Sequence, residues 1–251
     1  MTTMVTGGGA VNDKVYIHEF IDITKQNRGK YMHHITANWS PIAQDQRNQM
    51  CFGVWGVLGS TGRWPQTVNL WEEDGFGGLA ASFAIEVDGA AMQDPALERW
   101  WAGAADLRSG GVDRIMVPHP EMPTIERLCA AGCGAPVYAH ELARVRPGAA
   151  ADVLDCAVEE SRSSAPDGWR LIGALRTVMG NDDEILFLWA IDAWPSWGHA
   201  EQRAASGESR LLPKTSGELL SRHRLLLVDA PLAPLRTGRQ PQRADRTDWT
   251  D

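Results

Sequence analysis

Two short motifs each occur twice in this chain, in the same order. V-Y-I-H-E-F begins at Val15, and V-Y-A-H-E-L begins at Val137, 122 residues later. L-W-E-E-D begins at Leu70, and L-W-A-I-D begins at Leu188, 118 residues later. Motifs that recur in one order at nearly one spacing are typical of an internal duplication. The sequence therefore predicts two copies of one unit of about 120 residues.

Hydrophobic patterning predicts the same order of elements in both copies. Period-2 alternation indicates strands, and longer amphipathic runs with capping residues indicate helices. The first copy is predicted to contain strand 14–23, helix 24–47 interrupted at Pro41, strands 51–58 and 67–73, helix 94–108 and strand 112–118. The second is predicted to contain strand 136–145, helix 148–164, strands 169–178 and 184–191, a helix from Asp192 and strand 223–229.

The order β-α-β-β-α-β is that of the ferredoxin-like arrangement. Its helices cover one face of the sheet, so the bare face must be buried elsewhere. We expect an α+β fold in which two tandem ferredoxin-like repeats pack sheet to sheet as a barrel, with a pocket between the sheets. The predicted organisation is a flexible N-terminus (1–13), repeat 1 (14–118), a linker (119–135), repeat 2 (136–229) and an extended or disordered tail (230–251).

The amino-acid composition disfavours some classes of binding partner and favours others. Against 24 Lys and Arg stand 32 Asp and Glu, a net charge of −8, which disfavours nucleic acid. The absence of a long apolar run argues against a membrane partner, and four cysteines favour reduced thiols and a cytoplasmic location. The 11 Trp residues greatly outnumber the 3 Tyr. This excess predicts either a tryptophan-rich core or an aromatic-walled cavity for an apolar or aromatic small molecule.

The repeated motifs resemble those of NIPSNAP-like proteins in the dimeric α/β barrel superfamily. The likeness lies in Tyr16-Ile17-His18-Glu19, Tyr138-Ala139-His140-Glu141 and the two L-W-x-x-D segments. The superfamily includes cofactor-free monooxygenases, lactone isomerases, polyketide cyclases and haem proteins, so the resemblance implies the fold more narrowly than the reaction. An Arg that follows the Glu in the family is replaced by Ile21 and Ala143.

Alternation along the first strand of each copy assigns side chains to opposite faces. His18 and His140 are predicted to point into the cavity beside Tyr16, Phe20 and Tyr138. An imidazole there would be suited to general base catalysis near neutral pH. Glu19 and Glu141 belong to the opposite face, where each must find a partner. They become acid/base candidates if they face a cavity instead.

Further candidates are less closely tied to a motif. His33 and His34 lie on the first helix, where one of them is a further catalytic candidate at the cavity mouth. Trp55, Trp71 and Trp189 are predicted to line the pocket, and Arg170 is a candidate for binding a carboxylate or phenolate. No metal-binding or nucleotide-binding motif accompanies them.

The sequence therefore predicts a small-molecule enzyme without an organic cofactor, of monooxygenase, isomerase, cyclase or lyase type. Two alternatives stay open: an oxygenase that binds haem or a metal through a histidine, and a non-catalytic binding or scaffold protein. Pairing of two chains into a homodimer is also open.

Overall fold

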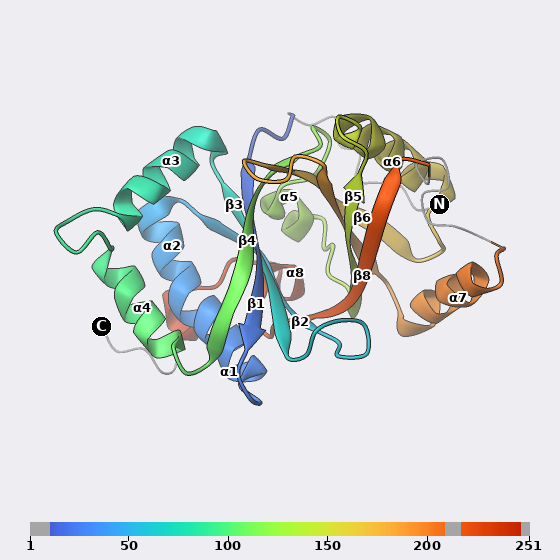
Figure 1. Ribbon diagram of the computed structural model, residues 1–251. Coiled ribbons are helices and arrows are strands. Elements are labelled where there is room, and N and C mark those ends of the chain that lie inside the picture. The colour runs from blue at the N-terminus through green and yellow to red at the C-terminus, as the bar shows by residue number, and fades with distance from the viewer. Residues whose placement is uncertain (1–10, 209–216, 247–251) are drawn as a thin grey trace.

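Eight antiparallel strands close into a barrel in the order β1-β3-β2-β8-β5-β7-β6-β4 (Figure 1). This architecture comes from a computed structural model, which describes residues 11–208 and 217–246. The α+β barrel expected from the sequence is confirmed. Most of the predicted N-terminal segment (1–13) lies outside the described residues. Asn12, however, is buried, and its amide donates to the Tyr16 hydroxyl.

The first half of the chain supplies four neighbouring strands and five helical segments. They are β1 (Val15–Ile23), α1 (Arg28–His33), η1 (His34–Trp39), α2 (Ser40–Arg47), β2 (Met50–Val57), β3 (Gln66–Glu73), α3 (Gly75–Glu86), α4 (Pro95–Ala104) and β4 (Arg108–Pro118).

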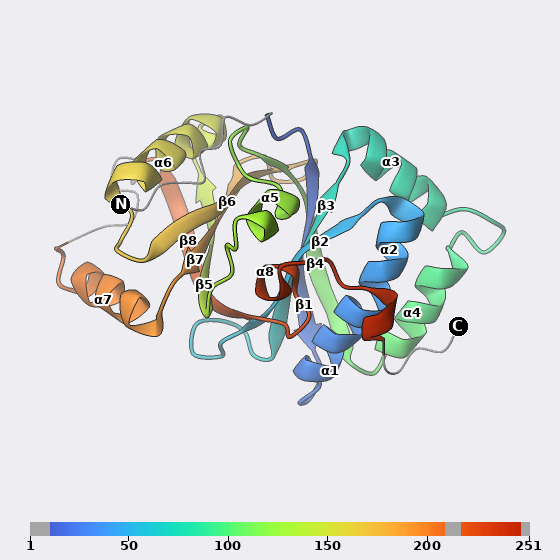
Figure 2. The ribbon, with the colours of Figure 1, turned by 180° about the vertical axis from the view of Figure 1, so that it is seen from behind.

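The second half repeats the order with fewer helices. It contains β5 (Val137–Val145), α6 (Ala150–Ser164), β6 (Trp169–Val178), β7 (Glu184–Ile191), α7 (Trp194–Ala205) and β8 (Leu219–Asp229). Within each half the first strand lies between the third and the fourth, as the β-α-β-β-α-β order requires. Figures 1 and 2 show α1–α4 on one flank of the barrel and α6 and α7 on the other.

Two short ladders join the halves. In one, Trp55 to Val57 of β2 pair with β8; in the other, Ile115 to Pro118 of β4 pair with β6. Closure within one chain leaves the eight-stranded sheet without a free edge.

The interior of the barrel is a packed core and not the pocket expected between the sheets. Fully buried side chains from both halves meet there, including Tyr16, Trp55, Tyr138 and Leu188. The linker contributes α5 (Ile125–Ala130), whose Ile125 and Leu128 join the same core. The structure thus fills the space that the sequence had assigned to a ligand.

The predicted extended or disordered tail (230–251) is corrected where the structure describes it. Residues 234–237 form the short helix α8 (Pro234–Thr237), which lies beside α5 (Figure 2). The Leu235 side chain enters the barrel core. Gln240 then donates to the Cys51 carbonyl and accepts from its backbone N–H. An apolar side chain and backbone hydrogen bonds therefore hold a segment whose composition suggested disorder. Residues 247–251 lie outside the described part.

The first long helix is irregular where the sequence predicts it. Residues 28–47 run through α1, η1 and α2, and η1 is π-helical. Pro41 lacks a backbone N–H, and its ring crowds the carbonyl four residues earlier, at Ala37 within η1. The π-helical turn thus directly precedes Pro41, whose missing N–H and bulky ring disfavour a regular α-helical turn there.

Candidate functional site

His18 and His140 do not line a cavity, which corrects their predicted placement. Their Nε2 atoms lie 2.8 Å apart and their exposed fractions are 0% and 1%, so no water-sized space adjoins either ring. One Nε2 must donate and the other accept, so the two rings have different tautomers. Burial is the main cause that lowers the pKa of both. The pair is a neutral link between the halves, with no room for a substrate or a haem iron beside it.

Three other predicted pocket residues also belong to the packed interior. The Tyr16 hydroxyl donates to Glu72, and the Tyr138 hydroxyl donates to Asp229. Trp55 is 1% exposed. The partly buried Phe20 packs against both histidine rings.

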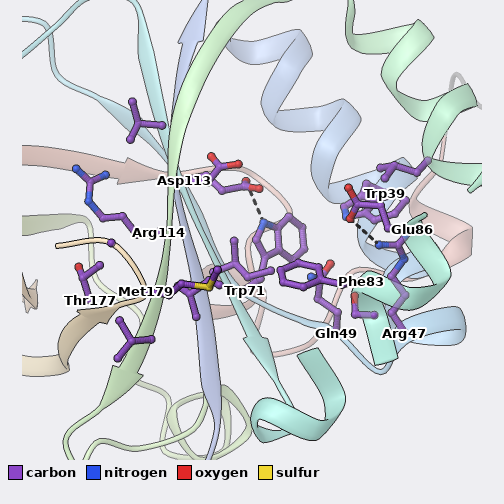
Figure 3. A pocket seen from close by; sticks show the side chains of 18 of the residues that line it. Trp39, Arg47, Gln49, Trp71, Phe83, Glu86, Asp113, Arg114, Thr177 and Met179 are labelled. Carbon is purple, nitrogen blue, oxygen red and sulfur yellow. Dashed lines mark hydrogen bonds and ion pairs between the residues drawn. The ribbon is translucent and has the colours of Figure 1, made fainter. Parts of the chain in front are cut away.

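A pocket of about 660 Å³ lies instead on the outer face of the first sheet, between β1, β3 and β4 and the helices η1, α3 and α4 (Figure 3). Its size suits a drug-sized ligand. Aromatic and aliphatic side chains form much of its wall: Ile17, Ile35, Trp39, Trp71, Phe83, Leu97, Trp100, Trp101, Val112 and Ile115. Thr177 to Asn181, around the β6–β7 turn, complete it from the second half.

Glu19 lies in the wall of this pocket, on the face of β1 opposite to His18. Its Oε2 accepts from the Asn69 side-chain amide at 2.7 Å and from the Trp71 indole N–H at 3.0 Å. The Asn69 amide also donates to the Tyr31 hydroxyl at 3.2 Å. Unlike His18, Glu19 retains accessible surface, and that surface faces the pocket. The carboxylate is therefore both oriented and reachable.

Asp113 faces Glu19 on the neighbouring strand. The two residues are direct partners in the β1–β4 ladder, and both line the pocket. Burial, followed by repulsion from Asp113, raises the pKa of Glu19 to about 7. Burial also raises the pKa of Asp113, while Arg108 and Arg114 oppose the rise. Because the two carboxylates repel each other, ionisation of one makes ionisation of the other less favourable.

The second half presents the opposite arrangement at the equivalent positions. Glu141 is fully buried and faces Arg224 in the β5–β8 ladder, at an Oε1–Nε distance of 3.0 Å. Arg222 contacts the same oxygen at 3.1 Å. Phe187 stands where the first half has Asn69, and the Trp189 indole N–H has no hydrogen-bond partner. Glu141 is thus neutralised in an ion-pair cluster, whereas Glu19 faces a like charge and a pocket.

Three further predicted residues, His33, His34 and Arg170, do not line the pocket. His34 is buried, stacks on Trp100 with centroids 5.3 Å apart, and contacts the Trp100 carbonyl through Nε2. It also fits closely against Gly103, where a Cβ would lie 2.9 Å from the ring. His33 is half-buried on the same helix and does not line the pocket. Arg170 donates to the Cys133 carbonyl, which attaches β6 to the linker.

The two tryptophans predicted to line the pocket from the equivalent strands β3 and β7 have different environments. Trp71 lines the pocket, and its indole binds Glu19. Trp189 packs against Trp169 inside the second half, with ring centroids 6.1 Å apart.

Sequence reasoning missed Asp113, Asn69 and much of the aromatic wall. A signal for two of them was present in the repeat. Asn69 precedes Leu70-Trp71, where Phe187 precedes Leu188-Trp189. Aligning the last strands of the two copies would likewise have set Asp113 against Arg224. At these matched positions the first half carries Asn69 and Asp113, and these differences indicate that its outer face differs from that of the second half.

Within the described residues, no group of three or more His, Cys, Asp and Glu side chains is arranged to hold a metal ion. In that same part of the chain, none of the helices has the length and apolar character needed to cross a membrane.

These features define the fold class: a closed eight-stranded α+β barrel in which one chain supplies both halves, with a pocket over the first sheet. No profile of a known protein family matches the sequence, and no curated protein does. Solved structures share the fold over nearly the whole chain. An "anthrone oxidase-like protein" has a TM-score of 0.60 at 11% identity, with 87% of this chain and 92% of that chain covered.

Two bacterial structures are similar in extent. A "putative monooxygenase" from Lactobacillus acidophilus has a TM-score of 0.55 at 10% identity and covers 92% of this chain and 97% of its own. One from Fusobacterium nucleatum has a TM-score of 0.54 at 12% identity, with coverage of 88% and 93%. A shorter NIPSNAP family protein from Agrobacterium tumefaciens covers 41% of this chain and 93% of its own, at 23% identity and a TM-score of 0.33. The fold assignment rests on the three longer matches.

Proposed function

We propose that this chain is a small-molecule enzyme of the cofactor-independent monooxygenase type. The substrate would be an aromatic compound bound over the first sheet, with Glu19 as the general base. The observation that carries the proposal is the difference between the halves. Glu19 is accessible from an aromatic pocket and faces Asp113, whereas Glu141 is sealed and ion-paired. The names of the structural neighbours with the same fold support this reaction class.

The surroundings of Glu19 suit proton abstraction. Its raised pKa makes the carboxylate a stronger base than an exposed glutamate while leaving it largely ionised just above neutral pH. Hydrogen bonds from Asn69 and Trp71 fix Oε2, which leaves Oε1 for a proton from the substrate. The base is therefore held by side chains that do not themselves exchange protons at this pH.

An aryl ketone with an acidic CH₂ group, as in anthrone, matches this chemistry. Glu19 would remove one CH₂ proton, and the resulting carbanion would react with O₂. Overall, the CH₂ group and O₂ give C=O and H₂O, so atoms and electrons balance with O₂ as the oxidant. The apolar walls would limit water near the anion.

The test is oxygen uptake with anthrone as the probe. The wild-type chain should consume O₂ above the rate without protein, and Glu19→Gln should remove the difference. The matched control is His18→Asn with His140→Asn, which should keep turnover wherever the variant folds. Loss of turnover in a folded histidine variant with retention in Glu19→Gln would contradict the proposal. The scaffold alternative gains if anthrone binds to the wild type without O₂ uptake.

A further inference from the structure

The positive charges that line the Glu19 pocket are already engaged by acids. Arg47 contacts Glu86 at 3.4 Å and Asp94 at 3.1 Å, and Figure 3 shows the Arg47–Glu86 contact. Arg114 pairs with Glu184. An anionic ligand would therefore have to displace a buried or half-buried carboxylate to find a cation in this wall.

Glu19 and Asp113 remain as the acidic pair of the pocket. No Lys, Arg or His side chain of the described segments lies within 4.0 Å of either carboxylate. Arg108, on the same strand as Asp113, acts from a distance, and its guanidinium stacks over Trp101 at 5.2 Å from the ring centroid. From α1, Tyr31 faces the pair with a neutral hydroxyl.

From this charge pattern we propose that the pocket selects neutral hydroxyaryl compounds over aromatic carboxylates of the same size, and that Asp113 is the residue that sets this selectivity. The proposal deepens the proposed function and rests on it. A ligand hydroxyl would donate to a carboxylate of the pair, forming a charge-assisted hydrogen bond. A ligand carboxylate would add a further negative charge beside Asp113, within a pocket whose wall is largely apolar.

The second half shows what the pocket lacks. There, Arg224 occupies the position that matches Asp113, and it holds Glu141 in an ion pair. The same backbone register therefore supports a cation or an anion opposite the equivalent glutamate of each half. In the first half this position carries Asp113, so the glutamate is not neutralised and the pair repels an anionic ligand.

Two probes with one ring system test the selectivity: 2-naphthol, which is neutral at pH 7.5, and 2-naphthoate, which is charged. Isothermal titration calorimetry of the full chain should show naphthol binding at least about tenfold more tightly than naphthoate. Asp113→Asn should reduce that ratio about tenfold, chiefly by strengthening naphthoate binding. The matched control is Asp106→Asn, which removes a charge from an exposed residue outside the pocket and should leave the ratio unchanged.

Each contrary outcome has a distinct meaning. Equal binding of the two probes by the wild type, or the same ratio in folded Asp113→Asn, would overturn the selectivity and leave the aromatic pocket standing. Absence of binding by either probe would overturn the proposed function together with the selectivity. Because Asp113 is exposed and Asn has the same shape, circular dichroism of the variant should match that of the wild type.

Discussion

At the residue scale, two neighbouring side chains of β1 lie in opposite environments. His18 points into a closed core and is neutral, whereas Glu19 points outward into a pocket. A side-chain alternation of period 2 makes this separation unavoidable once the strand register is set. The residue that the sequence favoured as a base is therefore structural, and its neighbour is the better candidate.

Replacing the base should affect chemistry more than binding. We expect Glu19→Gln to lower kcat for anthrone oxidation by a factor of about 10² to 10⁴, which is typical of a lost general base. In the wild type, kcat/KM should rise with pH through about 7, because the base must be ionised. Stopped-flow measurement of O₂ uptake between pH 5 and pH 9 checks both. A pH-independent rate would show that Glu19 is not the base.

The histidine pair should make the fold sensitive to acid. The folded-state pKa of His140 is lowered to about 3, below its ordinary value of 6.5. Below pH 6.5 the two histidines are therefore protonated in the unfolded chain but remain neutral in the native state. Stability is complete above that value and falls as pH decreases toward about 3, by up to about 1.4 kcal/mol per pH unit for each histidine.

Urea unfolding across this pH range measures the effect. His140→Gln keeps a hydrogen-bond donor but does not titrate, so the acid-dependent loss should be smaller than in the wild type. An identical loss in the two proteins would assign the acid sensitivity to other groups.

At the scale of elements, the helical layer over the first sheet is organised around Asp94. Its side chain accepts from the backbone N–H groups of Ala96 and Leu97, which caps α4, and it also pairs with the buried Arg47. One residue thus begins a helix of the pocket wall and neutralises a cation from α2. Asp74, which precedes α3 (Gly75–Glu86), makes no cap hydrogen bond with its side chain and pairs instead with Lys14.

Two substitutions separate these roles. Asp94→Ala should lower the free energy of unfolding by about 3 kcal/mol, because the cap and a buried ion pair are both lost. Asp94→Asn keeps a capping oxygen and should be about 1 kcal/mol less destabilising than Asp94→Ala. Thermal and urea unfolding provide the comparison. Equal destabilisation by the two variants would show that the cap contributes nothing.

Local patterns predicted most elements within a few residues, because alternation, turns and caps are properties of short segments. The strands Trp169–Val178 and Glu184–Ile191 match their predicted bounds. The pocket could not be predicted in this way. It depends on how the π-helical turn, α3 and α4 sit over the sheet, and on Asp113, which approaches Glu19 only after strand pairing.

At the scale of the whole molecule, the barrel closes within one chain and its two halves are unequal. The inner faces of both sheets pack against each other in the shared core. The pocket therefore lies between the outer face of the first sheet and its helices. The second half contributes to the pocket of the first through the β6–β7 turn. Duplication of one unit remains a prediction from the repeated motifs.

The contribution of the β6–β7 turn to the pocket can be tested at Met179. Met179 is 88% exposed with φ of +55°, a conformation that glycine adopts more readily, and it lines the pocket. Met179→Gly should weaken 2-naphthol binding by a factor of about 3 to 10, since apolar contact is lost. Stability should change by less than about 1 kcal/mol, because relief of backbone strain offsets the added freedom of the unfolded chain.

Met92 offers a matched control, since it is 72% exposed with φ of +51° and lies outside the pocket. Met92→Gly should leave naphthol affinity unchanged. Equal affinities of the two variants, as measured by calorimetry, would remove the β6–β7 turn from the binding site.

The central claim is that Glu19 is a reachable carboxyl group with a raised pKa in a ligand pocket. The most direct test is ¹³C NMR of the full chain with selectively labelled glutamate side chains, titrated with and without 2-naphthol. We predict a resonance that titrates near pH 7, is absent from Glu19→Gln and shifts when naphthol is added. A Glu19 signal that titrates at the ordinary glutamate value, or that ignores saturating naphthol, would contradict it.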